Sequence, residues 1–364
     1  MPAALIKPSS LLASGGANPT VSAATRAGGM PIRVSIVVPA YNNSRELAQC
    51  LSALRAAAEP DTELIVIDDA SIDDVSSVAQ NAGAQVLRLP RNVGPAAARN
   101  QGARCARGQV LFFVDADVVV AHDAIARVRD FLECHQEIAA VFGSYDANPA
   151  APGLVSQYRN LLHHFVHQAG RTEASTFWAG CGAVRRAVFE SVGGFDSGRF
   201  PRPSIEDIEL GYRLRRAGYR IFLDKSLQGM HLKRWKLWTV IRTDIVHRAI
   251  PWSQLIVAGQ EAPDDLNLQR SQKLCVVLTG LSGLFCGASW LRPELLVAAL
   301  ACWVAIVVIN RELFAFFARV RGTLFATASV PLHLLYYACC GIGFQCAWLL
   351  SIRHRLVERR CGRA

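Results

Sequence analysis

The chain has 364 residues, of which 51% are hydrophobic and 19% are charged, and its formal net charge is +10. This length fits one large α/β domain of about 250 residues with an additional segment, and the hydrophobic fraction is high for a purely water-soluble protein. The sequence has no RNA-binding signature and no lysine-rich tail, so we expect no nucleic-acid partner. We assign the positive charge to two anionic partners, a phospholipid surface and a diphosphate substrate.

Cysteine usage and the first 30 residues both indicate a domain that stays in the cytoplasm. The eleven cysteines include no C-x-x-C pair, and seven of them lie at or beyond Cys275 in apolar surroundings. This pattern favours free thiols in a reducing compartment over a disulfide framework or a zinc site. Residues 1–30 are rich in Ala, Gly, Ser and Pro, and their one apolar patch, 11–13, is too short for a signal-peptide core. We predict a disordered leader over 1–30.

Short apolar runs alternate with helix-like stretches from residue 33 onward. The predicted strands are 34–38, 63–67, 85–89, 110–114 and 219–223, and the predicted helices are 44–56, 71–81 and 94–106. Nearly continuous apolar strands separated by helices are typical of a mostly parallel, Rossmann-like sheet covered by helices on both faces. We therefore predict an α/β domain over 31–230, with its ligand beyond the carboxyl ends of the strands.

Three of these strands end in short segments that carry polar side chains: Pro39-Ala-Tyr41, Asp68-Asp69 and Asp115-Ala-Asp117. Asp115 and Asp117 follow an apolar strand, and two like charges at the mouth of a core require a cation. A hard divalent ion bound by carboxylates and phosphate oxygens suits that place. For Ser71 and Asp73 the simpler interpretation is a helix N-cap.

The middle region, 119–225, contains a glycine-rich segment and a helix start. The segment is Phe177-Trp-Ala-Gly-Cys-Gly182. The run from Ile205 to Arg213 predicts a helix with Ser204 as its N-cap and acidic residues in its first turn.

Residues 231–271 form a predicted interfacial region. Cations alternate with tryptophans from His231 to Trp238, and the same mixture continues to Trp252. Basic residues beside indole rings suit the headgroup layer of a membrane, although an ordinary basic surface helix has a similar composition.

After Lys273 the chain is apolar in three runs, 274–291, 295–310 with 313–317 beyond it, and 322–352. The runs predict two to four transmembrane segments within 272–352, followed by a basic tail over 353–364. Three simple spans place that tail on the far side, which the positive-inside rule disfavours. Either the last run turns back or two runs form a shallow hairpin. We expect a multi-pass protein of the cytoplasmic (inner) membrane, with the catalytic domain facing the cytoplasm.

Five motifs together resemble the family 2 glycosyltransferases of the GT-A fold. They are V-S-I-V-V-P-A-Y-N at 34–42, D-D-A-S at 68–71, N-V-G-P-A-A-A-R-N at 92–100, D-A-D at 115–117 and E-D-I-E-L-G-Y-R at 206–213. One such motif is unspecific, whereas five in this order and spacing across residues 33–230 are a strong signal. The resemblance implies a GT-A-type fold and hexosyltransferase activity.

The resemblance also implies where the donor binds. In the family, the first strand end and the acidic pair hold the nucleotide base and ribose, and the matching residues here are Pro39, Tyr41, Asp68 and Asp69. Asn92, Gly94 and Arg99 follow, where a helix N-terminus suits an anionic donor and Arg99 offers its fork of donors to phosphate. Asp115 and Asp117 are implied to bind Mg²⁺ or Mn²⁺ bridging the diphosphate.

The acceptor side and the catalytic base are implied in the same way. Asp207 is the base that takes the acceptor's proton, with Glu206 beside it, and the anomeric centre is inverted. The segment with Trp178, Gly180 and Gly182 resembles the loop below the acceptor.

His231 resembles a third metal ligand, but it also starts H-L-K-R-W, with Arg234 and Trp235, which is similar to the Q-x-x-R-W of processive polysaccharide synthases. The His in place of Gln and the short membrane part both argue against processivity.

The sequence therefore predicts an inverting glycosyltransferase that uses a nucleotide-diphosphate sugar and a lipid-linked or surface-glycan acceptor. A nucleotidyltransferase shares the nucleotide-binding half of the sheet. Its reaction does not require the E-D motif at 206–207 or the membrane segments. A processive polysaccharide synthase and a non-catalytic scaffold that retains the fold each account for only part of the pattern. No residue of the nucleotide pocket selects a particular base or sugar.

Overall fold

The computed structural model describes residues 33–259, 266 and 269–361. The predicted leader 1–30 lies outside the described residues, as do 260–265 and 267–268 of the predicted interfacial region. Of the predicted basic tail, 362–364 lie outside them, and Arg353 has the last described side chain.

The first half of the sheet is parallel, as predicted. β1 (Val34–Ala40) pairs with β2 (Thr62–Asp68) and β4 (Val110–Val114), and β2 pairs with β3 (Gln85–Arg88). Ala40 lies opposite Asp68, so β1 and β2 end at the same level and direct the following residues to one edge. The polar strand ends seen in the sequence therefore meet at this edge.

The second half of the sheet is mixed, so the whole sheet is less parallel than the predicted one. Its strands are β5 (Val118–Val120), β6 (Ile138–Tyr145), β7 (Glu173–Ala174), β8 (Cys181–Arg185) and β9 (Arg220–His231). The order is β3-β2-β1-β4-β8-β6-β9-β5, with β7 on β9. β8 is antiparallel to both β4 and β6, and only the β6–β9 pair is parallel in this half of the described sheet. The predicted strand at 219–223 is the first part of the longer β9.

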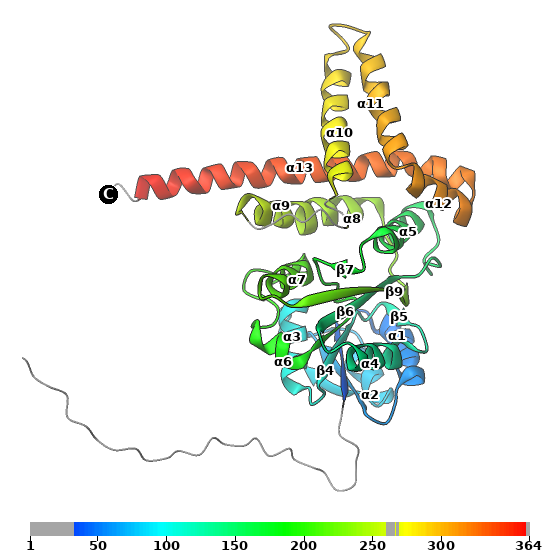
Figure 1. The fold of residues 1–364 in the computed structure, drawn as a ribbon, viewed down its shortest axis with the longest axis vertical. Helices are drawn as coiled ribbons and strands as arrows, with labels where there is room; N and C mark the ends of the chain where they lie inside the picture. The colour runs from blue at the N-terminus through cyan, green and yellow to red at the C-terminus, as the bar shows by residue number, and fades with distance from the viewer. Residues whose placement is uncertain (1–32, 260–265, 267–268, 362–364) are drawn as a thin grey trace, which may run out of the picture. The chain divides into compact units, whose positions relative to one another are not determined.

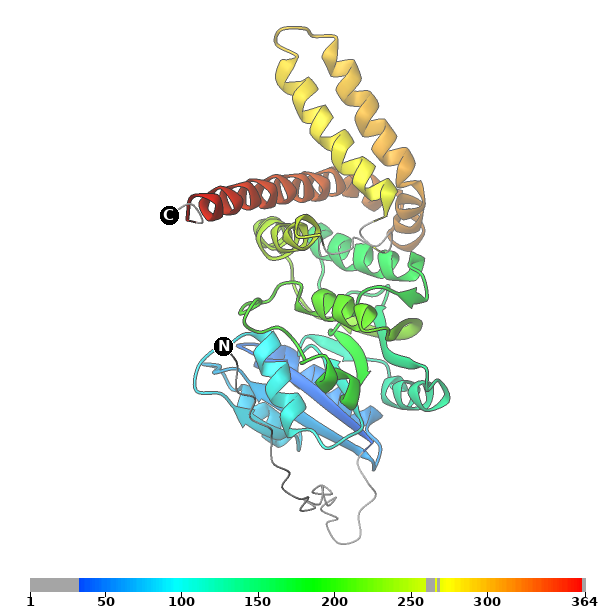
Figure 2. The same cartoon turned by 60° about the vertical axis from the view of Figure 1, so that its left-hand side comes forward.

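Helices cover both faces of the sheet, which confirms the predicted layers (Figures 1 and 2). One face packs on α1 (Ser44–Ala57), α2 (Val75–Asn81) and α4 (Ala124–Cys134), and the other on α3 (Pro95–Cys105), α6 (Arg186–Ser191) and α7 (Glu206–Arg216). β1 shows the reason, since Ile36 and Val38 belong to the first core and Val37 to the second. Side chains alternate between the faces of a strand, so a run that is apolar throughout must be covered on both sides.

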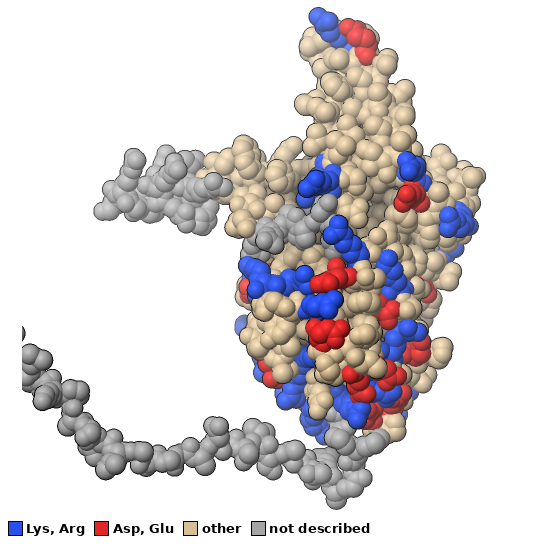
Figure 3. All heavy atoms as spheres, in the orientation of Figure 1, with Lys and Arg blue, Asp and Glu red and all other residues tan. Residues whose placement is uncertain are grey.

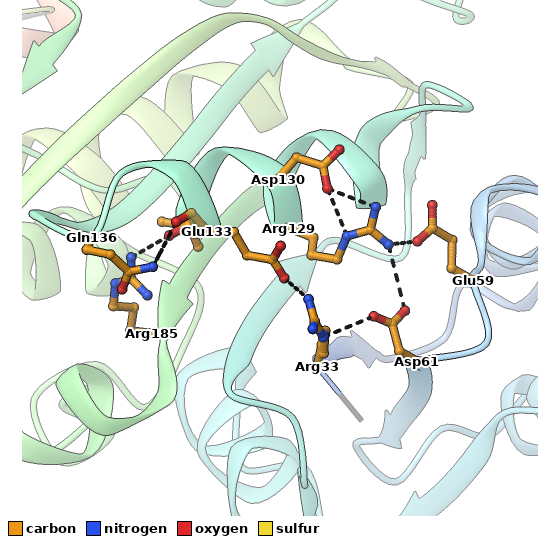
Figure 4. A network of polar contacts seen from close by, with 9 residues as sticks. Arg33, Glu59, Asp61, Arg129, Asp130, Glu133, Gln136 and Arg185 are labelled. Carbon is orange, nitrogen blue, oxygen red and sulfur yellow. Dashed lines mark hydrogen bonds and ion pairs between the residues drawn. The ribbon is translucent and has the colours of Figure 1, made fainter. Parts of the chain in front are cut away.

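Charged side chains surround the amino ends of β1 and β2, opposite the edge where the polar strand ends meet (Figure 4). Arg33 contacts Glu133 and Asp61, and Arg129 contacts Glu59, Asp61 and Asp130. These pairs lie at the surface, where each contributes about 0–1 kcal/mol, so we give this network a structural role and no part in the site.

The C-terminal helices form two arrangements. α8 (Leu237–Arg242), the π-helix η1 (Thr243–Ala249) and α9 (Ile250–Val257) run on from one another. α10 (Arg270–Ala288) and α11 (Leu295–Ile309) form a hairpin, and α12 (Arg311–Arg321) leads to α13 (Thr323–Cys361). Figures 1 and 2 both draw α13 running across the base of the hairpin, beside α9.

Within the described residues, α10 and α13 are each long and apolar enough to cross a membrane. The pair α11–α12, bent by 67°, adds a third candidate if it is taken as one broken span. Figure 3 shows charged side chains over the domain that holds the sheet, while the hairpin is free of charge along most of its visible length. These features indicate association with a membrane.

Candidate active site

A cavity of about 650 Å³ opens at the edge where β1 and β4 end. The structure brings most of the predicted site residues to its wall: Pro39, Tyr41, Asp69, Asn92, Gly94, Arg99, Asp115, Asp117, Trp178, Glu206, Asp207, His231 and Trp235. Asp68, Gly180, Gly182 and Arg234 were also predicted for the site but do not line the cavity.

Asp68 and Asp69 have different roles, although the sequence predicts both as ligands of the nucleotide. Asp68 is fully buried, and its carboxylate accepts hydrogen bonds from the backbone N–H of Ser71 (2.8 Å) and from Arg88 Nη1 (3.0 Å). It organises the turn after β2. Asp69 lines the cavity and accepts from the backbone N–H groups of Val93 (2.8 Å) and Gly94 (2.9 Å). Asp69 therefore fixes the loop that leads into α3.

The ends of β1 and β2 are joined through side chains. Asn42 accepts a hydrogen bond from the backbone of Ile72 (2.8 Å), and its own N–H donates to Ser71 Oγ (3.1 Å). Asp73 accepts from the backbone N–H of Ser44 (2.8 Å), the first residue of α1. The prediction that Ser71 and Asp73 cap the helix after them is therefore wrong, because that helix begins only at Val75 and both side chains serve the neighbouring loop.

Two non-glycine residues at these strand ends have left-handed backbone angles, Asn42 (φ 53°) and Ala70 (φ 61°). Such conformations cost of order 1–3 kcal/mol each and concentrate at functional sites. The cavity edge is thus held in a strained, preorganised shape.

Arg99 is buried and binds two carboxylates at once. Its Nη2 lies 2.6 Å from Asp115 Oδ1 and its Nη1 lies 3.0 Å from Glu206 Oε1. The guanidinium group therefore links the end of β4 to the start of α7. Both of its terminal nitrogens are already paired with acids, so the predicted contact of Arg99 with phosphate stays a prediction.

Asp117 lies beside His231, as the third-ligand interpretation requires. His231 Nε2 is 3.4 Å from Asp117 Oδ2, and its Nδ1 is 2.6 Å from Asn160 Oδ1. Since an amide oxygen can only accept, Nδ1 carries the proton and Nε2 faces the carboxylate. Burial alone raises the pKa of Asp117, but His231 and Lys233 lower it to about 2. Asp117 is therefore fully ionised.

Asp207 lies in the first turn of α7, partly buried at the cavity wall. Its carboxylate accepts from the backbone N–H groups of Ala179 (3.2 Å) and Ile208 (2.9 Å). Burial and the charge of Glu206 raise the pKa of Asp207 to about 7. A carboxylate with such a pKa can accept a proton near neutral pH. Ser204 does not cap α7 as predicted: Ile205 occupies the N-cap position, and Ser204 Oγ donates to the carbonyl of His247 (2.9 Å).

Comparison with known proteins agrees with this geometry. The family model described as "Glycosyl transferase family 2" matches residues 35–193. A probable glycosyltransferase, YdaM of Bacillus subtilis, is 27% identical over 229 residues, which are 58% of this chain and 54% of YdaM. The matched region, residues 35–193, has the sequence of a glycosyl transferase family 2 domain. It spans about half the length of the curated relatives it matches.

Two further proteins are similar to this chain. The pre-mycofactocin glycosyltransferase of Mycobacterium tuberculosis is 29% identical over 199 residues, covering 52% of this chain and 40% of the relative. The solved structure of the mannosyltransferase PcManGT from Pyrobaculum calidifontis is 19% identical with a TM-score of 0.57, covering 87% of this chain and 90% of the other. The second likeness supports the predicted GT-A-type fold.

The two predicted acceptor-side glycines lie beneath Trp178 instead of facing the cavity. A Cβ on Gly180 would lie 2.5 Å from the Trp178 ring, and a Cβ on Gly182 would lie 2.2 Å from the Trp178 carbonyl oxygen. These glycines are needed because the 177–178 backbone and the indole pack directly on them. They place Trp178, which does line the cavity.

Arg234 is exposed and points elsewhere, whereas its neighbours Lys233 and Trp235 line the cavity. The sequence also missed a wall formed by α5 (Leu154–Ala169), η1 and α13, which contributes Asn160, His163 and Arg248. One signal was available for α5, where polar residues recur at helical spacing from 159 to 167. Nothing in the sequence relates η1 or α13 to the site.

Proposed function

We propose that the protein is an inverting glycosyltransferase that moves a sugar from a nucleotide-diphosphate donor to a lipid-linked or surface-glycan acceptor at the membrane. One observation carries this proposal. A single cavity joins the ionised Asp117 and its neighbour His231 to Asp207, the carboxyl group with a pKa near neutrality. The proposed donor site and the proposed proton acceptor therefore line the same cavity.

The donor half of the cavity supports binding of a nucleotide diphosphate. Pro39, Tyr41 and Asp69 line its outer end, where a base and ribose fit. The N-terminus of α3 opens into the cavity at Gly94 and Pro95, and the partial positive charge of a helix N-terminus favours phosphate. The similar mannosyltransferase PcManGT is described in complex with GDP-Man and Mn²⁺, and we propose a donor of that general class here.

The residues at the end of β4 fit a divalent ion in the chemistry of their donors. Within the described part of the chain, no three His, Cys, Asp or Glu side chains are grouped to hold a metal by themselves. Asp117 and His231 offer an oxygen and a nitrogen, with Asp115 beside them, and the His231 ring is held by Asn160 as metal-bound imidazoles usually are. We propose that these residues hold Mg²⁺ or Mn²⁺ together with diphosphate oxygens. When bound, the ion supplies positive charge that stabilises the leaving diphosphate.

The chain's own groups account for the proton transfer. We assign Asp207 Oδ2 as the atom that takes the proton of the attacking acceptor hydroxyl, and the N–H groups of Ala179 and Ile208 hold this carboxylate in place. Arg99 pairs with Glu206 beside it, and its positive charge partly offsets the effect of Glu206 on the pKa of Asp207. One displacement with a single base inverts the anomeric centre.

We further propose that the α10–α11 hairpin crosses the cytoplasmic membrane and that the catalytic domain faces the cytoplasm. Large apolar side chains are exposed along both helices, including Leu284 (70%) and Val297 (71%). Exposed Leu237 and Trp238 on α8 suit the headgroup layer.

The proposal is tested with membranes that contain the full chain, incubated with labelled UDP-, GDP- and dTDP-sugars with and without Mn²⁺. We expect metal-dependent transfer of label to lipid or glycan, and Asp207→Asn should abolish it while Asp130→Asn, at an exposed carboxylate of α4, should not. Equal transfer by wild type and Asp207→Asn refutes the base assignment. Release of diphosphate from a nucleoside triphosphate, with no sugar transfer, indicates a nucleotidyltransferase instead.

A further inference from the structure

A further part of the cavity wall, called the distal part here, consists of residues that the proposed function does not place in contact with the donor. These residues come from α5, the segment after β9, η1 and α13. Arg248 of η1 and Lys233 after β9 both line the cavity, and neither has a carboxylate partner among the described residues. The third cation there, Arg159, is already paired with Asp244. This distal part of the cavity therefore carries an excess of positive charge.

Arg248 is surrounded by charges of both signs. Desolvation by the surrounding protein and the charge of Arg159 lower the pKa of Arg248, while the carboxylates of Asp244 and Asp207 raise it. Arg248 and Asp207 both line the cavity. Lys233 also lines the cavity, and its ammonium helps to lower the pKa of Asp117.

Buried polar atoms without partners gather in the same region. Among the described residues, Asn160 Nδ2, Trp235 Nε1, His163 Nδ1 and Asp244 Oδ2 are buried and make no hydrogen bond, and all four residues line this cavity. The Asn160 amide and the Trp235 indole can only donate at these atoms. Buried polar groups are normally satisfied, so these two unmet donors, in a cavity wall that also holds Arg248, fit an acceptor such as an oxyanion.

The far wall of the distal part is apolar and belongs to α13, through Tyr336 and Cys340. α13 is one of the helices that can cross a membrane, and it exposes Ile342 and Phe344 close by in the sequence. A ligand that fills the distal part therefore has its anionic group among donors and its remaining atoms against an apolar helix. That combination describes an amphiphile.

We propose that the distal part of the cavity binds the phosphate of a lipid-linked acceptor, with the phosphate at Arg248, Trp235 and Asn160 and the lipid chain along α13. This inference rests on the proposed function and narrows its acceptor class. The sugar hydroxyl that attacks lies next to Asp207, on the donor side of the phosphate. A phosphate ester carries about one to two negative charges and suits the fork of an arginine better than a neutral glycolipid does.

Binding to the full chain purified in detergent tests the inference, by titration in EDTA so that the metal-dependent donor site is silent. The probes are farnesyl diphosphate, inorganic diphosphate and farnesol. We expect farnesyl diphosphate to bind most tightly and Arg248→Gln to weaken it at least about tenfold, the size expected for a charge-assisted hydrogen bond. Arg242→Gln removes an exposed arginine of the same helical stretch that does not line the cavity, and should leave binding unchanged.

Each outcome bears on a different part of the inference. Equal binding of farnesol and farnesyl diphosphate, or no effect of Arg248→Gln, overturns the phosphate site. Equal binding of inorganic diphosphate overturns the lipid part. If Arg248→Gln lowers the yield of folded protein, Trp235→Phe offers a second test. It keeps an aromatic ring at this position and removes the N–H donor, and it should still weaken the binding of farnesyl diphosphate.

A separate titration of the wild-type chain with UDP and GDP in Mn²⁺ reports on the proposed function. Nucleotide binding without farnesyl diphosphate binding refutes the acceptor inference alone, whereas loss of nucleotide binding refutes the function itself.

Discussion

Tyr158 of α5 and His333 of α13 share a hydrogen bond of 2.9 Å between the phenol oxygen and Nδ1. The other nitrogen of His333 lies 3.1 Å from the hydroxyl of Tyr337, which contacts Gln272 (2.6 Å) and Asn310 (3.0 Å). This buried chain of polar groups joins the catalytic domain to α10, α11 and α13. Satisfied buried networks specify one arrangement of the elements that carry them, so this one fixes the apolar wall of the cavity.

Removing the Tyr158 hydroxyl should loosen that connection. Tyr158→Phe leaves His333 with an unmet buried nitrogen, which costs about 1–3 kcal/mol. We expect a lower melting temperature in detergent and faster proteolysis between the domain and the helices. Tyr219→Phe is the matched control, since its hydroxyl makes only a 3.4 Å contact with Ser191 at the surface. Identical melting of the two variants contradicts the role of the network.

Arg99 should not tolerate lysine. An ammonium group cannot hold Asp115 and Glu206 together with the fork that now spans them. One acid is then left poorly paired in a buried place, which costs about 3 kcal/mol or more. Arg99→Lys should therefore lower both the melting temperature and sugar transfer, whereas Arg104→Lys, on the exposed side of α3, should change neither. Normal transfer by Arg99→Lys contradicts the linking role.

The rate of transfer should rise with pH through neutrality. Burial and Glu206 raise the pKa of Asp207 to about 7, and a base works only when deprotonated. The rate should therefore fall about tenfold per pH unit below about pH 6 and become constant above about pH 8. A flat profile between about pH 5 and 8 excludes Asp207 as the base.

The carboxyl group of Asp207 should lower the free energy of unfolding at high pH. Its pKa is raised from 3.8 in the free side chain, so the folded state binds a proton more tightly than the unfolded state does. The loss of folding stability caused by ionising Asp207 is absent at low pH, grows above about pH 4 and is complete above about pH 7. Asp207→Asn should therefore raise the melting temperature at pH 8 but not at pH 4, while abolishing transfer.

The sequence was sufficient for the parts of the fold that depend on local pattern. Strands such as β4 are uniformly apolar, and the acids directly after them had to reach the sheet edge, so Asp115, Asp117 and Asp69 were placed correctly. The antiparallel insertion of β8 between β4 and β6 was not predicted, because strand direction is decided by connections that the apolar pattern does not record.

The errors at the site have one physical origin, namely that the sequence does not show which side chains pair. The pairing of Arg99 with Glu206 was not predicted, because it joins distant parts of the chain. Asp68 and Asp69 are neighbours in a shared motif, yet only contacts with Arg88 and Val93 distinguish the turn residue from the cavity residue. The place of Arg248 in the cavity depends on how η1 packs, which its basic surroundings in the sequence do not reveal.

Gly182 should be sensitive to the smallest substitution. The Cβ of Gly182→Ala would lie 2.2 Å from the Trp178 carbonyl oxygen and 2.8 Å from the Phe177 ring. Since backbone cannot move away cheaply, Trp178 should shift and transfer should fall at least about tenfold, which a titration of rate against acceptor concentration measures. Gly198→Ala, whose Cβ would come no closer than 3.5 Å to Asp196, is the control. Unchanged transfer shows that Trp178 does not shape the acceptor side.

The tip of the α10–α11 hairpin should lie across the membrane from the catalytic domain. The 19 residues of α10 extend about 28 Å, close to the hydrocarbon thickness of about 30 Å. The exposed Trp290 (81%) at the tip is suited to the opposite interface, and the ion pair of Arg292 and Glu294 there is too costly to leave in lipid.

The same geometry decides what α13 does. Because α13 runs across the base of the hairpin (Figures 1 and 2), it cannot also span if α10 and α11 do, and it should lie along the cytoplasmic interface. An epitope inserted after Leu291 should then be reached by antibody only from the far side. An epitope fused after Ala364 should be reached only from the side of the catalytic domain, which also satisfies the positive-inside rule. A C-terminal epitope on the far side shows instead that α13 crosses the membrane and that the hairpin does not insert upright.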